Sequence, residues 1–307
     1  MRKTKRIFGK LFSLLSLSAI IFFAFSLSSE AAEYVKRGMK LSIERVIPTA
    51  FPFMILTEAY TAYAKPEELK VLSFLFTRLF GINESGLRPF LCGNIAGFPL
   101  GTRIAASMYE NGEIEKGMTE RLLALSSNPS LPFMLGAVGG GMYGSIKTGA
   151  YLALSVYLST LICGIIFKGK KKSVKKRYDR GGTPFSLTKS ITRAGESCIG
   201  ISSFITFFSV LSGIVSARIS SPLISTALCS VLEVTTGVYS ASALYSSYPL
   251  ISLSISAFAL GFGGLSVLMQ SAYFKRKTDL GMSKYLIMKL TQGLLSSGIA
   301  IIAFSIT

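Results

Sequence analysis

The stretch GNIAGFPLGTRIAASMYENG, residues 93–112, mixes apolar side chains with residues that an uninterrupted membrane-spanning helix does not favour. From Gly93 to Ala105 a small residue recurs at every fourth position, so a continuous helix would carry one smooth face for close packing. Pro99 removes a backbone hydrogen bond and interrupts that helix, and Arg103 adds a charge that lipid accepts only at a high free-energy cost. We therefore expect a broken helix with polar atoms at the break.

The composition of the whole chain predicts a membrane protein. Half of the 307 residues are hydrophobic and the mean hydropathy is +0.52, which is unusual for a water-soluble domain. Apolar windows near or above the roughly 18 residues needed to span a bilayer lie at 11–27, 151–167, 199–215 and 286–304. No polar stretch is long enough for a separate soluble core, so we expect one all-α, polytopic membrane domain.

The net charge of +18 is concentrated in runs of Lys and Arg at 1–6, 168–180 and 275–277, next to the apolar windows. This distribution is typical of cytoplasmic loops of inner-membrane proteins and places the N-terminus in the cytoplasm. The run at 168–180 is either a solvated loop or a contact with anionic lipid. The charge thus has a membrane explanation, and we expect no nucleic-acid partner.

Several kinds of chemistry are excluded or disfavoured by the residues present. The chain has no histidine, which excludes Ser-His and Cys-His catalysis. Its four cysteines are scattered without metal-ligand spacing, and no phosphate-binding Gly-rich loop with Lys occurs. We expect no metal, no cofactor and no enzymatic activity.

The order of apolar and polar stretches suggests four parts. Residues 1–38 form an N-terminal transmembrane anchor, which is either an uncleaved first span or a signal peptide. Residues 39–167 form a first repeat, 168–190 the basic cytoplasmic loop, and 191–307 a second repeat. Within the first repeat, Pro48 and Pro52 are expected to kink the span at 39–62.

Each repeat contains one hairpin and one broken span. The apolar halves of the first hairpin, 87–92 and 95–108, are too short to cross, and the second hairpin covers 222–245. The broken spans are 122–144, interrupted by Ser and Pro residues, and 249–274, interrupted by GFGGLSVLMQ. Because the basic runs give the two halves opposite orientations, we expect an inverted repeat with two re-entrant hairpins, an architecture of secondary transporters.

At these residues the chain resembles the sporulation integral membrane protein YlbJ family of the nucleoside-recognition, or Gate, domain group. That group includes concentrative nucleoside transporters and the membrane part of the ferrous-iron transporter FeoB. The motifs that carry the resemblance are FPFMILTE (51–58), GNIAGFPLGTRIAASMYENGEI (93–114), ERLLALSSNPSLPFMLGAVGGGMYG (120–144), LEVTTG (232–237) and GFGGLSVLMQ (261–270). The resemblance implies two hairpins and two broken helices around a central site. It further implies a role in spore formation, with movement of dipicolinic acid across a forespore membrane.

Polar residues at the four interruptions are the candidate substrate-binding residues. They are Asn94, Thr102, Arg103, Ser127, Asn128, Ser130, Glu233, Thr235, Thr236, Ser266 and Gln270. In the first hairpin, free backbone N–H groups and Arg103 would hold a carboxylate, unless Arg103 only extends to the membrane interface. Ser127 and Asn128 would cap a half-helix whose positive end faces an anion, or would cap it without any ligand.

The remaining candidates also have a structural alternative. Glu233 lies among apolar residues and by default marks an ion, proton or substrate site, although pairing with Arg218 would explain it equally. Gln270 either binds solute with Ser266 or bridges helices. Glu58, at the end of its span, is either a site residue or a structural residue at the interface.

The leading hypothesis is a transporter of a small polar or anionic organic solute in the bacterial cytoplasmic membrane, forespore membrane included. Membrane lipid and either a second copy or a second membrane protein are the other expected partners. The alternative is a membrane scaffold or assembly protein of the same fold that carries nothing and is needed for spore maturation.

Overall fold

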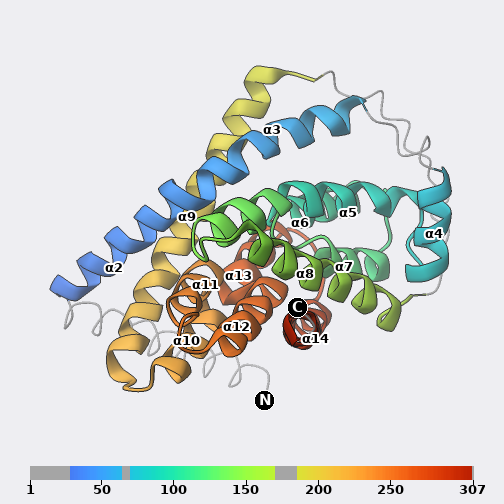
Figure 1. Ribbon diagram of the computed structural model, residues 1–307. Coiled ribbons are helices and arrows are strands. Elements are labelled where there is room, and N and C mark those ends of the chain that lie inside the picture. The colour runs from blue at the N-terminus through green and yellow to red at the C-terminus, as the bar shows by residue number, and fades with distance from the viewer. Residues whose placement is uncertain (1–27, 64–69, 170–184, 306–307) are drawn as a thin grey trace, which may run out of the picture.

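The computed structural model describes residues 28–63, 70–169 and 185–305 (Figure 1). Most of the predicted N-terminal anchor and of the basic loop lies outside these residues. Every regular element in the described part is a helix, as expected. In chain order the elements are α2 (Ser28–Leu41), η1 (Ser42–Val46), α3 (Ile47–Tyr63), α4 (Lys70–Phe80), α5 (Glu84–Ala96), α6 (Leu100–Glu110), α7 (Lys116–Leu125), η3 (Phe133–Gly140), α8 (Ile146–Ile166), α9 (Leu187–Arg218), α10 (Pro222–Leu232), α11 (Val234–Ala243), α12 (Pro249–Phe262), α13 (Gly264–Phe274) and α14 (Ser283–Ser305).

Four helical segments of the described chain are long and apolar enough to cross a membrane. They are Ile146–Ile166, Leu187–Arg218, Pro249–Phe274 and Ser283–Ser305, the third of which comprises α12 and α13. The chain is therefore an integral membrane protein by composition and helix length.

The distribution of side chains on α14 is the reverse of that in a water-soluble protein. Leu294 and Ile302 are 66% and 62% exposed, whereas the side chains of Lys289, Gln292 and Ser296 are buried. An apolar outer face with a polar inner face is favourable when lipid, rather than water, surrounds the helix.

Two groups of helices contain the long candidate spans (Figure 1). In one group α8, α12 and α14 pack against one another, and the hydroxyls of Ser159 and Ser296 lie 2.6 Å apart between α8 and α14. In the other group α2 and α3 pack along α9. Shorter helices connect the groups: α5 packs on α3, and α11 packs on both α9 and α12.

The helical run from Ser28 to Tyr63 is continuous, so the predicted boundary between residues 38 and 39 falls inside it. Its π-helical turn, η1, ends two residues before Pro48. A proline has no N–H for an intrahelical bond and its ring collides with the carbonyl four residues earlier, which a wider turn relieves. Pro52 lies within α3 itself.

The helices are interrupted at the four predicted places. α5 and α6 separate at residues 97–99, α7 and η3 at 126–130, α10 and α11 at Glu233, and α12 and α13 at Gly263. The breaks at Gly97 and Gly263 have positive φ angles of 85° and 87°, which glycine adopts without strain.

One detail of the sequence interpretation is wrong. Gly93 and Gly101 do not share one face of one helix, because the chain leaves the helix at Gly97. They instead face each other across the α5–α6 pair: a Cβ atom added to Gly101 would lie 2.7 Å from Cα of Gly93. The small residues permit two helices to approach, rather than one helix to present a smooth side.

Candidate functional site

The four breaks lie in two contacting pairs. The N–H of Phe98 in the first break donates to the carbonyl of Asn128 in the second, at 2.8 Å. At the other pair, a Cβ atom added to Gly264 would lie 3.2 Å from both the Leu232 carbonyl oxygen and the Val234 nitrogen, which flank Glu233. Glycine is needed at this second contact because backbone meets backbone.

A cavity lies where the two pairs meet. Its walls include Gly97, Ser130, Glu233 and Ser266, so each of the four breaks contributes to them. Most of the remaining lining is apolar, from α3, α9 and neighbouring elements. The space not filled by atoms is about 450 Å³ including the mouth, but the centre of a water molecule can occupy only about 30 Å³. That is room for about two waters.

Two polar atoms of the cavity wall have no hydrogen-bond partner among the described residues. They are Oγ of Ser266 and Oε1 of Gln270, on side chains that are 0% and 3% exposed. A buried polar atom without a partner costs free energy, so each such atom calls for a water or a ligand. Both residues come from the predicted set, and the cavity brings them together.

Glu233 is the charged residue of this wall, and its side chain is wholly buried. Its Oε1 accepts from the N–H of Thr235 at 2.9 Å and its Oε2 from the N–H of Thr236 at 2.6 Å. The carboxylate thus caps the positive N-terminal end of α11. No contact joins Arg218 to Glu233 in the described part of the chain, and a carboxylate oxygen can accept more than one hydrogen bond.

The neighbouring hydroxyls divide between the cavity and the helix contacts. Thr235 and Ser130 line the cavity, and Oγ of Ser130 accepts from the N–H of Phe133 at 3.3 Å. The hydroxyl of Thr236 lies 3.0 Å from that of Ser209 on α9 and joins two helices.

The polar residues of the first hairpin do not line the cavity. Thr102 donates to the carbonyl of Leu123 at 3.2 Å. Arg103 forms an ion pair with Glu58 of α3 at 3.1 Å and donates to the hydroxyl of Ser197 on α9 at 3.3 Å. The structure thus places Arg103 and Glu58 together in a contact among α6, α3 and α9.

A second polar cluster lies beside the break after α7 and centres on Lys289 of α14. Its Nζ donates to the carbonyl oxygen of Ser127 at 2.6 Å, to Oδ1 of Asn128 at 3.1 Å and to Oε1 of Gln292 at 2.8 Å. Asn128 also donates to Oδ1 of Asn94 at 2.9 Å. Two predicted residues, Ser127 and Asn128, therefore contact a lysine that the sequence interpretation missed, and Asn128 also contacts a third, Asn94. The sequence did contain a signal for this residue, since a lysine lies near the start of the apolar window at 286–304.

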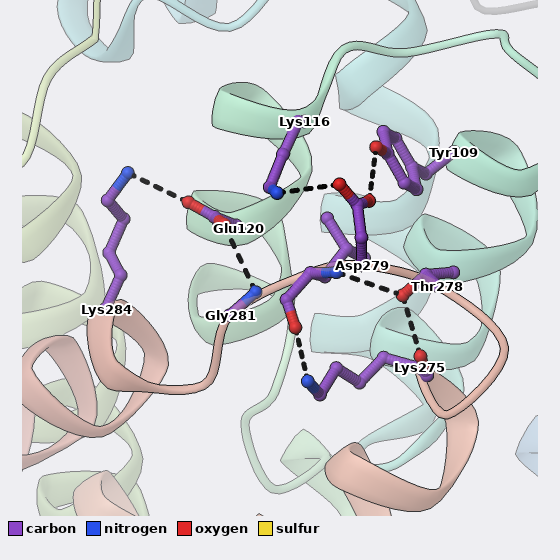
Figure 2. Close-up of polar contacts among 9 residues, drawn as sticks. Tyr109, Lys116, Glu120, Lys275, Thr278, Asp279, Gly281 and Lys284 are labelled. Atoms are coloured by element: carbon purple, nitrogen blue, oxygen red, sulfur yellow. Dashed lines mark hydrogen bonds and ion pairs between the residues drawn. The ribbon is translucent and has the colours of Figure 1, made fainter. Parts of the chain in front are cut away.

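A third polar cluster fastens the connection between α13 and α14 onto the other half of the chain (Figure 2). Asp279 accepts from Tyr109 Oη at 2.7 Å and pairs with Lys116 Nζ at 2.8 Å. Glu120 of α7 accepts from the N–H of Gly281 and pairs with Lys284, both at 3.2 Å. The hydrogen bonds from Lys116 and then Tyr109 lower the pKa of Asp279 below its ordinary value.

Comparison with known proteins places the chain near one characterised membrane protein. It is 24% identical to the sporulation integral membrane protein YlbJ of Bacillus subtilis (strain 168), over an alignment that covers 85% of this chain and 74% of that protein. No protein-family model matches the chain. No solved structure matches it. The chain is thus a membrane protein distantly related to a sporulation protein.

Proposed function

We propose that this chain transports a small polar solute and holds it in the cavity between the four helix breaks. The observation that carries the proposal is the pair of unpartnered atoms in the cavity wall, Ser266 Oγ and Gln270 Oε1. Both atoms face the same cavity, so one polar guest there could satisfy them together.

The chemistry of the wall favours a solute with hydrogen-bond donors and without a large negative charge. Glu233 supplies a carboxylate and Gln270 a free carbonyl oxygen, and both accept hydrogen bonds. The described lining contains no Lys or Arg, while Arg103 and Lys289 are engaged outside it. A neutral or cationic solute therefore fits this wall better than a dianion such as dipicolinate, which the family resemblance implied.

The transport cycle in this proposal uses two re-entrant hairpins, α5–α6 and α10–α11, in an inverted repeat with the broken spans α7–η3 and α12–α13. The present cavity has room for about two waters, so a solute enters only when the two pairs of breaks separate. Alternate opening toward each side of the membrane would then move the solute across. By analogy with its relative, we place the protein in a bacterial cytoplasmic or forespore membrane.

The small volume of the cavity favours a second candidate function, a membrane scaffold of the same fold that carries no solute. In that case the unpartnered atoms would be bridged by permanently bound water.

The test is a thermal-unfolding screen of the purified protein in nanodiscs against nucleosides, polyols, amines and pyridine dicarboxylates, followed by flux of each hit in proteoliposomes. A solute that binds the folded state raises the unfolding temperature by mass action. Ser266→Ala should weaken that shift. Ser212→Ala is the matched control, because Ser212 Oγ is equally buried and unpartnered but does not line the cavity. Absence of any stabilising solute and of any flux would favour the scaffold.

A further inference from the structure

Lys289 is wholly buried in a membrane-spanning helix, which is an unfavourable place for a charge. Its nitrogen has three acceptors within 3.1 Å, one carbonyl and two amide oxygens. A neutral amine has two N–H donors and an ammonium group has three. The three contacts are therefore those of an ammonium ion.

The three oxygens are neutral, but their positions favour a cation. The carbonyl of Ser127 lies two residues past the last residue of α7, near the negative C-terminal end of that helix dipole. Within the described chain, no ion pair with a carboxylate is found for Lys289. Its charge is balanced by oriented dipoles rather than by an opposite charge.

The side-chain oxygens are also held in place by bonds of their own. Gln292 donates to Oδ1 of Asn128 at 2.6 Å and to the hydroxyl of Thr160 at 2.8 Å. Asn128 donates to Asn94 and to the carbonyl of Leu125, at 2.9 and 3.1 Å. These bonds, from α5, α8 and α14, fix where the amide oxygens point. Fixed neutral oxygens converging on one charge are the arrangement of an oxygen-lined cation site.

We propose that the Lys289 ammonium is a built-in cation, which fills a monovalent-cation site at the break between α7 and η3. When its side chain is removed, the site binds a free primary ammonium ion in its place. The chain supplies this charge itself, so the fold requires no alkali cation at this position.

The test uses Lys289→Ala, which removes the carbons and nitrogen equivalent to n-propylammonium and leaves the three oxygens in place. Thermal unfolding of the full chain is measured in nanodiscs at constant ionic strength in choline, ammonium, n-propylammonium or tetramethylammonium chloride. Tetramethylammonium carries the same positive charge as the other cations but has no N–H donors. Lys289→Met is the matched control, since its side chain fills the space without a charge.

We expect n-propylammonium, and ammonium less strongly, to raise the unfolding temperature of Lys289→Ala saturably by several degrees. Neither ion should do so for Lys289→Met or the unaltered chain, and tetramethylammonium should have no effect. If Lys289→Ala is unstable in choline, the fraction of monodisperse protein extracted from membranes in each salt serves as the readout.

The proposal is overturned if Lys289→Ala responds equally to all four salts, or if the unaltered chain shows the same response. If Lys289→Ala is unstable in choline, the proposal is also overturned when n-propylammonium yields no more monodisperse variant than choline does. These stability measurements do not depend on solute movement. The cation-site proposal can therefore be wrong while the transport proposal holds, and the transport proposal can be wrong while the cation-site proposal holds.

Discussion

Replacing Gly101 with alanine should disturb the contact that brings the first two breaks together. The added Cβ atom would lie 2.3 Å from the carbonyl oxygen of Ser126, 2.6 Å from its Cβ and 2.7 Å from Cα of Gly93. Ordinary contacts between such atoms are about 3.5 Å or longer. Two of these three neighbours are backbone atoms, so the α5–α6 pair and the break after α7 must move apart by about 1 Å.

Forced separation of this kind costs about 1–3 kcal/mol of folding free energy. Gly117→Ala, in α7, is the matched control, because a Cβ atom there meets nothing within 4 Å. In a helical position without such contacts, that exchange is expected to stabilise by about 0.5–1 kcal/mol. The two variants make the same chemical change and should differ in opposite directions from the unaltered chain.

The assay is thermal unfolding in nanodiscs, with the monodisperse fraction after extraction as a second measure. Gly101→Ala should unfold at a lower temperature than the unaltered chain, and Gly117→Ala at the same or a higher temperature. Equal stability of the two variants would refute the close approach of α5, α6 and the break after α7.

Three further predictions concern other parts of the chain. Pairing lowers the pKa of Asp279, so the contribution of this carboxylate to stability is complete above the ordinary carboxyl pKa and is lost as the pH falls through the lowered value. The unfolding temperatures of Asp279→Asn and the unaltered chain, measured against pH, should therefore converge in acid. A difference that stays constant with pH would contradict this. Arg103→Ala and Glu58→Gln should each lower the unfolding temperature, and the double variant should lose less than the sum of the two losses. Both variants should still be stabilised by a solute. If a stably folded Arg103→Ala lost its response to the solute, Arg103 would belong to the binding site. Gly263→Ala, at a positive φ angle, should destabilise by about 1–2 kcal/mol, whereas Gly200→Ala, which meets nothing within 4 Å, should not; unfolding temperatures that agree would argue against the left-handed turn.

The positions of the breaks could be predicted because their causes are local in sequence. Pro99, Pro129 and Gly263 interrupt helices through their own backbone geometry, whatever surrounds them. The position of Glu233 within an apolar segment of the sequence likewise indicated an unusual environment before any contact was known.

The partners of the charged residues could not be predicted, because they depend on how distant helices pack. Arg103 meets Glu58 from a helix 45 residues earlier in the chain, and local spacing carries no information on that contact. Lys289 was overlooked for a related reason. A single lysine in an apolar window does not by itself indicate a site. Only the rotation of the helix in the structure shows that the side chain faces inward.

The most direct test of the solute-binding cavity is the reactivity of a cysteine placed in its wall. The four native cysteines, Cys92, Cys163, Cys198 and Cys229, are buried and would first be replaced by alanine or serine. Ser266→Cys and Ser212→Cys are then compared in membranes with a small, water-soluble methanethiosulfonate reagent. Both positions are buried, and only Ser266 lines the cavity. We predict that Ser266→Cys is labelled, that a stabilising solute slows its labelling, and that Ser212→Cys is not labelled. Equal reactivity at the two positions, or none at Ser266→Cys, would contradict a cavity between the four helix breaks that opens to admit a solute.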